Sequence, residues 1–178
     1  MFKIVRIPQK SPAIEQSEIE LMEIERNCFH PEVQETWESK KKLLQLAISC
    51  FFAYVEGKIV GEAYAINKDT IFLSNAYHKD QDNFNKLISM MTDHEVYLCS
   101  FGVLSQFNGK GIGRALISNV IVDTIDKGYM MGYAYAHESA SEHICKKFHG
   151  KIISEHKNWF GEANTRILYK IGCIDDQG

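Results

Sequence analysis

The sequence has little proline, no long apolar run and no marked excess of either charge. Only 3 of its 178 residues are proline, the last of them Pro31, so later turns must depend on glycine and asparagine. No stretch approaches the roughly 18 apolar residues of a membrane-spanning helix, and residues 1–8 hold no apolar block suited to a signal peptide. We therefore expect a cytoplasmic protein that does not act on a membrane.

Charge and cysteine content exclude further classes of protein. Lys and Arg total 20 against 23 Asp and Glu, and a formal net charge of −3 argues against a nucleic acid partner. The 5 cysteines have no paired spacing, which is typical of reduced thiols. The length suits one domain over residues 1–178, with a tail at 172–178. We expect the protein to be a monomer or a homodimer.

Hydrophobic patterning predicts an α/β protein. Gly57 can take the positive φ of a tight hairpin between two of the expected strands, and Gly128 is a suitable helix stop. Strands are expected at 2–7, 50–55, 59–66, 95–103, 129–137, 151–156 and 165–171, and helices at 17–30, 33–48, 115–127 and 141–148.

Three local features add detail to this order. Ser17 and Glu20 have the spacing of a capping box at the start of the first helix. The lysine run at 40–42 predicts a solvated helix face. Residues 67–93 fit the pattern less well. We interpret them as a lid-like excursion over the sheet, with a strand at 70–73 and a helix at 83–91.

A glycine cluster follows the strand at 95–103 and precedes a helix. Gly109, Gly111 and Gly113 alternate there, and glycine allows the backbone to approach a phosphate without a Cβ in the way. A helix N-terminus offers unpaired N–H groups and the positive end of its dipole. Lys110 and Arg114 add positive charge. The loop therefore predicts a phosphate or pyrophosphate site, the alternative being a tight turn without a ligand.

Two common nucleotide motifs do not fit this loop. A P-loop requires Gly-x-x-x-x-Gly-Lys followed by Ser or Thr, which is absent. A dinucleotide fingerprint requires Gly-x-Gly-x-x-Gly, whereas residues 109–113 read Gly-x-Gly-x-Gly. The loop therefore matches neither of these nucleotide-binding motifs.

Residues 98–116, Leu-Cys-Ser-Phe-Gly-Val-Leu-Ser-Gln-Phe-Asn-Gly-Lys-Gly-Ile-Gly-Arg-Ala-Leu, resemble the acyl-CoA-binding motif of the GNAT superfamily of N-acyltransferases. Gly111 and Gly113 match the two motif glycines. Asn108 stands where Gln or Arg is usual, and Ser105 where proline is usual. Residues 144–152 are similar to the family's Phe-Tyr-x-Lys-Leu-Gly-Gly-Lys segment, and residues 24–29 to a first-helix segment of some members.

The resemblance implies a fold, a co-substrate and a reaction. The fold is the GNAT fold, a mixed central sheet of about six or seven strands flanked by helices. Acetyl-CoA is the implied co-substrate, without a metal, and its acetyl group passes to a primary amine of a small molecule, protein N-terminus or lysine by direct attack. A non-catalytic acyl-CoA-binding sensor or scaffold is the alternative. The implied CoA-binding residues are Phe101, Gly102, Val103, Asn108, Gly109, Lys110, Gly111, Ile112, Gly113 and Arg114.

The resemblance also suggests two catalytic residues. Glu95 aligns with a catalytic glutamate of histone-acetylating members, the alternative being a solvated carboxylate at a strand start. Cys145 stands where the family has a tyrosine that acts as the general acid, and a thiol could protonate the departing thiolate of CoA. The alternative is that Cys145 is a small buried hydrophobic residue. Tyr133 and Tyr135 share a face of one strand and are fallback candidates for the acid, although aromatic residues of the core are the favoured interpretation.

A metal site is a weaker interpretation of the residues around Cys145. Cys145 and His149 lie four apart on a helix, with His137 and His143 nearby. Nothing else near them has ligand spacing, and histidine is common at a helix C-terminus. We expect no metal.

Overall fold

The computed structural model describes residues 1–136, 139–156 and 166–171. One mixed sheet has the strand order β1-β2-β3-β4-β5-β7-β6, in which only β4 and β5 pair in parallel. The prediction of an α/β fold with six or seven strands is confirmed. The strands are β1 (Lys3–Arg6), β2 (Ser49–Val55), β3 (Lys58–Asn67), β4 (Glu95–Val103), β5 (Met130–Ala136), β6 (Lys151–His156) and β7 (Arg166–Lys170).

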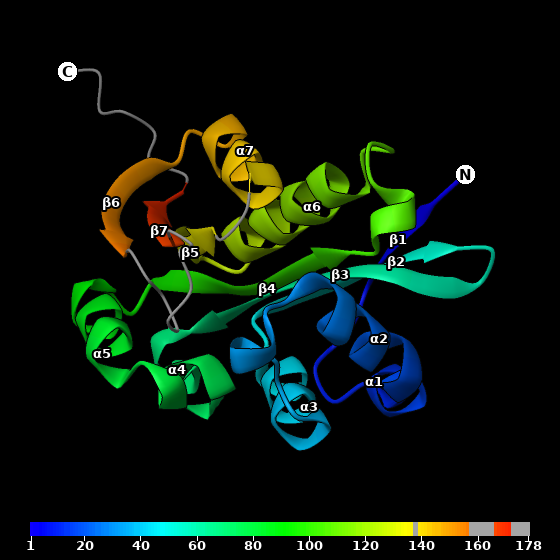
Figure 1. The fold of residues 1–178 in the computed structure, drawn as a ribbon, viewed down its shortest axis with the longest axis horizontal. Helices are drawn as coiled ribbons and strands as arrows, with labels where there is room; N and C mark the ends of the chain where they lie inside the picture. The colour runs from blue at the N-terminus through cyan, green and yellow to red at the C-terminus, as the bar shows by residue number, and fades with distance from the viewer. Residues whose placement is uncertain (137–138, 157–165, 172–178) are drawn as a thin grey trace.

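The helices cover both faces of this sheet (Figure 1). On one face lie α1 (Pro12–Gln16), α2 (Glu18–Cys28) and α3 (Trp37–Leu46), with α4 (Asn75–Lys79) and α5 (Gln81–Met90) towards one end. On the other face lie α6 (Ile112–Asp126) and α7 (Ser139–Lys147). Short 3₁₀ turns are η1 (Pro31–Val33), η2 (Lys68–Leu73) and η3 (Ser105–Phe107). None of the helices described here is both long and apolar enough to span a membrane.

Each face of the sheet has its own hydrophobic core. Ile14, Leu21 and Leu43 belong to the cluster beneath the first three helices. The opposite cluster includes Leu116 of α6 and small residues of the sheet. A Cβ at Gly61 of β3 would lie 2.9 Å from a carbonyl oxygen and 3.3 Å from Leu116, so a glycine there lets α6 pack close to the strands.

The structure differs from the sequence-based expectations in the first helical region. Helix α1 was not predicted, and its N-cap is Ser11, whose side chain accepts a hydrogen bond from Ala13. The expected capping box is wrong, because the Ser17 side chain makes no capping hydrogen bond. Helix α3 starts at Trp37 rather than at residue 33, since Thr36 is its N-cap and accepts from Ser39 N–H.

The excursion at 67–93 also differs from its expected structure. Residues 70–73 belong to the 3₁₀ turn η2 and not to a strand. Thr70 Oγ1 donates to Asn67 Oδ1 at 2.7 Å, a local bond that favours a turn over an extended strand. The expected helix is present as α5, with α4 before it. The connection at 158–164, the tail at 172–178 and His137 lie outside the described residues.

Candidate active site

Strands β4 and β5 separate part-way along their length. Their pairing ends at Leu98 and Ala134, whereas β4 stays paired with β3 as far as Val103. The register with β3 shifts at this point, because Ser100 lies opposite Tyr64 and Leu98 opposite Ala65, leaving Cys99 as the extra residue of a bulge. A bulge bends its strand. From Cys99 to Val103, the edge of β4 that faces away from β3 is therefore not paired with β5.

The glycine loop lies beyond this unpaired edge and begins α6. Gly109 and Gly111 have positive φ values of 76° and 79°, which favour glycine. Gly111 is the N-cap of α6 and provides no side-chain cap, so the first N–H groups of the helix have no partner within it. A Cβ built on either glycine meets no atom within 4 Å. The loop is open in front of a helix N-terminus, which suits an anion.

A cavity of about 690 Å³ joins the edge of β4 to the glycine loop. Its volume is that of a small-molecule site. Every CoA-binding residue suggested by the sequence lines this cavity except Lys110, whose Nζ lies 4.9 Å from the centre of the Phe107 ring. The residues that line it are Phe101, Gly102, Val103, Asn108, Gly109, Gly111, Ile112, Gly113 and Arg114.

Charged groups reach the cavity from opposite faces of the sheet. Arg114 of α6 and His143 and Lys147 of α7 supply cationic or ionisable nitrogen on one face. Glu25 of α2 and Glu35, just before α3, supply carboxyl groups from the other face. The separation of β4 from β5 lets one cavity reach both. The first group suits an anionic ligand and the second a cationic one.

The two catalytic candidates suggested by the sequence do not line this cavity. Glu95 is buried at the start of β4, accepts Thr92 N–H at 2.8 Å and lies 2.9 Å from Lys170 Nζ. Burial opposes its ionisation, but the Thr92 and Lys170 contacts outweigh burial and lower the pKa of Glu95. Cys145 is 1% exposed and belongs to the hydrophobic cluster between α6 and the sheet, and burial raises the pKa of its thiol to about 12. Of the two candidate tyrosines, Tyr135 lines the cavity.

A family model matches the sequence, and solved structures match the fold. A family model described as "Acetyltransferase (GNAT) family" matches residues 19–151. The chain belongs to the GNAT acetyltransferase family. The resemblance seen in residues 98–116 is thereby confirmed. No curated protein matches the chain by sequence.

Several solved structures share the GNAT fold with this chain. The ribosomal-protein-S18-alanine N-acetyltransferase of Escherichia coli is 12% identical, with a TM-score of 0.64 over 100% of this chain and 99% of that one. NAA60 of Arabidopsis thaliana, solved in complex with acetyl-CoA, is 16% identical, with a TM-score of 0.66 over 96% and 97%. A ribosomal-protein-alanine N-acetyltransferase of Brucella melitensis is 18% identical, with a TM-score of 0.63 over 94% and 98%. At these identities the likeness concerns the fold.

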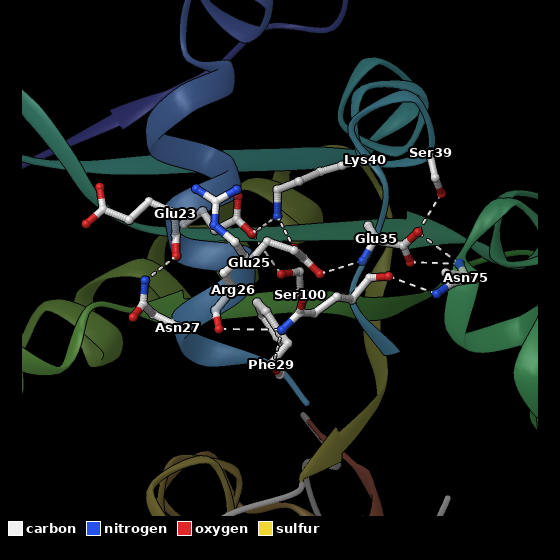
Figure 2. Close-up of polar contacts among 12 residues, drawn as sticks. Glu23, Glu25, Arg26, Asn27, Phe29, Glu35, Ser39, Lys40, Asn75 and Ser100 are labelled. Atoms are coloured by element: carbon white, nitrogen blue, oxygen red, sulfur yellow. Dashed lines mark hydrogen bonds and ion pairs between the residues drawn. The ribbon is translucent and has the colours of Figure 1, made fainter. Parts of the chain in front are cut away.

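In this GNAT protein a buried cluster of charges lies beside the cavity. Lys40 is fully buried, so the expectation of a solvated face at residues 40–42 is wrong for this lysine. Its Nζ lies 2.5 Å from a carboxylate oxygen of Glu25 (Figure 2) and 2.5 Å from one of Glu62. Burial opposes the charge of Lys40, but the two carboxylates outweigh burial and raise its pKa. Ser100 donates to the same Glu62 oxygen at 3.0 Å.

Glu35 occupies a different environment, in which no ammonium of the described residues forms an ion pair with it. Both of its oxygens lie 2.9 Å from the N–H of Asn75, and Oε2 lies 2.5 Å from the hydroxyl of Ser39 (Figure 2). Burial raises the pKa of Glu35 to about 7, although the bonds from Ser39 and Asn75 favour its charged form. Sequence analysis did not single out Glu25, although it lies in the segment 24–29 that is similar to the family. It missed Glu35 because this residue belongs to no motif and its partner Asn75 lies 40 residues further along the chain.

The raised pKa of Glu35 predicts that the protein loses stability as pH rises. Unfolding returns this carboxyl to its ordinary pKa of 4.5, so the folded protein binds the proton of Glu35 more tightly than the unfolded chain does. The resulting stabilisation of the fold is complete below pH 4.5 and is lost as pH rises through the folded pKa of about 7. Glu35→Gln lacks this effect. Between about pH 5 and about pH 8, the native free energy of unfolding should fall by about 1–3 kcal/mol relative to that of the variant. Urea denaturation of both proteins measures this, and a pH-independent difference would contradict the prediction.

Proposed function

We propose that this protein transfers the acetyl group of acetyl-CoA to a primary amine by direct attack of the amine. The observation that carries the proposal is the unpaired edge of β4 leading, within one cavity, to the open glycine loop at the start of α6. Residues 101–103 would bind the pantetheine arm through their backbone. The N–H groups of residues 108–114 would bind the pyrophosphate.

The residues around the loop fit this co-substrate. The space in front of Gly109 and Gly111 is open, and a side chain at either position would occupy it. Arg114 and Lys147 bring positive charge to the same cavity, which suits the phosphates of CoA. The carboxyl groups of Glu25 and Glu35 suit an acceptor that arrives as an ammonium. Acetyl-CoA supplies an activated acyl group with a thiolate leaving group.

Release of free thiol from acetyl-CoA with a panel of amines tests the proposal. The panel should contain aliphatic diamines, arylalkylamines and peptides that offer either an N-terminal amine or a lysine. Thiol release that depends on one class, with the acetylated amine seen by mass spectrometry, would support the transfer. Binding of acetyl-CoA without release on any amine would overturn it and favour the non-catalytic binding module.

Cys145 as the acid that protonates the departing thiolate remains a prediction from the family resemblance. If this thiol donates the proton, Cys145→Ala should slow turnover at least tenfold, since general acid catalysis is typically worth about 10²–10⁴. The affinity for acetyl-CoA should change little, because the thiolate charge develops only in the transition state. Steady-state kinetics with an accepted amine measure both. Turnover of Cys145→Ala within twofold of the native rate would show that Cys145 only packs in the hydrophobic cluster between α6 and the sheet.

The remaining sequence-based interpretations belong to the same proposal. We propose that residues 1–178 act as one cytoplasmic domain, as a monomer or homodimer, without a metal. Residues 67–93, which contain η2, α4 and α5, are proposed to contribute to the acceptor site, because Ser74 and Ala76 line the cavity. Glu95 as a catalytic base remains a prediction from the resemblance, and its ion pair with Lys170 does not favour that role.

A further inference from the structure

We propose that Glu35 is the general base that takes a proton from the acceptor amine. The inference rests on the proposed acetyl transfer and adds a catalytic role that sequence motifs did not suggest. An amine that arrives as an ammonium has no free electron pair. Transfer of one proton from its nitrogen to Glu35 yields the neutral amine, which can attack the thioester, and a neutral carboxylic acid.

Of the two described carboxyl groups that line the cavity, that of Glu35 suits this role better. Glu25 also lines it, but both oxygens of Glu25 are engaged, one by Lys40 Nζ at 2.5 Å and one by the N–H of Glu35 at 2.8 Å. A carboxylate in contact with a buried ammonium is a weak base. Among the residues that the structure describes, Glu35 has no ion-pair partner, and its Oε1 accepts one hydrogen bond, from the N–H of Asn75.

Glu35 also lines the cavity together with a residue at the place where the sheet opens. That residue is Cys99, which lines the same cavity. Cys99 is the bulge residue at which β4 leaves β5. Burial raises the pKa of Tyr64, which lines the cavity from β3, and the negative charge of Glu35 adds to this rise. The charged groups that act on Glu35 itself are Glu25 of α2 and Lys40 of α3.

The hydrogen bonds around Glu35 can hold the carboxyl group in either protonation state. The Ser39 hydroxyl lies 2.5 Å from Glu35 Oε2 and 2.9 Å from the carbonyl oxygen of Leu73, yet it has one proton to donate. When Glu35 is charged, Ser39 can donate to Oε2. When Glu35 has gained a proton, Glu35 can donate to Ser39, and Ser39 can donate to Leu73. The carboxyl can thus accept a proton without leaving a buried donor unpaired. Its pKa of about 7 matches this task near neutral pH.

Glu35→Gln tests the inference without disturbing the site. The glutamine amide resembles the protonated carboxyl, because its oxygen can accept from Asn75 and its NH₂ group can donate to Ser39. We therefore expect native folding and a native thermal shift with acetyl-CoA. Turnover with an accepted, fully protonated amine at pH 7 should fall by about 10²–10⁴. With a weakly basic analogue of that amine, which arrives without the extra proton, turnover of Glu35→Gln should fall much less.

Two further variants separate the catalytic role from charge and packing. Glu32→Gln removes an exposed carboxylate three residues away, which pairs with Lys79 at 3.6 Å, and should leave turnover within twofold of native. Ser39→Ala removes a bond that lowers the pKa of Glu35, so the acidic limb of its kcat/KM profile should move to higher pH. This movement of the profile would not be expected of a merely structural residue.

The outcomes distinguish this inference from the proposed function. Turnover of Glu35→Gln within twofold of native at pH 7, or a loss equal for the strongly and weakly basic amines, would overturn the role of Glu35 while acetyl transfer stands. Absence of transfer by the native protein to every amine would overturn both.

Discussion

Gly111→Val is expected to abolish the thermal stabilisation of the protein by acetyl-CoA. In the native protein, a ligand at 100 times its dissociation constant should stabilise the fold by about 2.7 kcal/mol. Gly111 is the N-cap of α6, and the space next to it is open. A valine side chain would fill the space that the pyrophosphate requires. Differential scanning fluorimetry across a range of acetyl-CoA concentrations measures the shift.

Gly128→Val provides the control for backbone strain. Gly128 lies just beyond the other end of α6, has the same φ of 79° as Gly111, and also has no atom within 4 Å of a built Cβ. Both variants force a β-branched residue into a left-handed conformation and should lose similar stability. Only Gly111→Val should lose the ligand shift. A folded Gly111→Val protein that keeps the native shift would contradict the assignment of the glycine loop to CoA.

Lys40→Met is expected to lower the free energy of unfolding by about 3–5 kcal/mol, because it leaves buried carboxylates without their cation. Glu62 is fully buried, and its second oxygen has no hydrogen-bond partner among the described residues. The pKa of Glu62 is already raised by burial, and loss of Lys40 should raise it further. Denaturant unfolding at neutral pH measures the change.

Lys41→Met is the matched control for this prediction. Lys41 is the next residue of α3, and its side chain reaches solvent, where it pairs with Glu15. Its replacement should leave the melting temperature close to native. Adding Glu62→Gln to Lys40→Met should restore part of the lost stability, because the deepest unpaired charge is then removed. Equal effects of the Lys40 and Lys41 substitutions would contradict the buried cluster.

The glycine loop could be predicted from sequence because its requirement is local. Alternating glycines before a helix indicate an open helix N-terminus, and the structure has left-handed backbone at Gly109 and Gly111. Lys40 could have been placed correctly from helical spacing, since it lies three and four residues before the buried Leu43 and Leu44. Three consecutive lysines suggested instead a uniformly solvated face, and only the first is buried.

Glu35 could not be found in this way. Its environment is made by Asn75 and by the carbonyl of Leu73, both in a segment that the sequence assigned only to an excursion. Local patterns describe which residues share a helix face, but they do not state which distant backbone N–H group will meet a carboxyl. The side of the cavity that we propose for the acceptor is built from such distant contacts, so its chemistry was not evident from motifs.

The separation of β4 from β5 has a consequence for the cohesion of the protein. Among the described residues, the strand pairing between β1–β4 and β5–β7 is limited to the short stretch from Glu95–Met130 to Leu98–Ala134. A molecule bound along the free edge of β4, and touching α7 through Ile144 or Lys147, would bridge the two parts. The bound co-substrate would then serve as a structural tie between the amino- and carboxy-terminal parts of the sheet as well as a reactant.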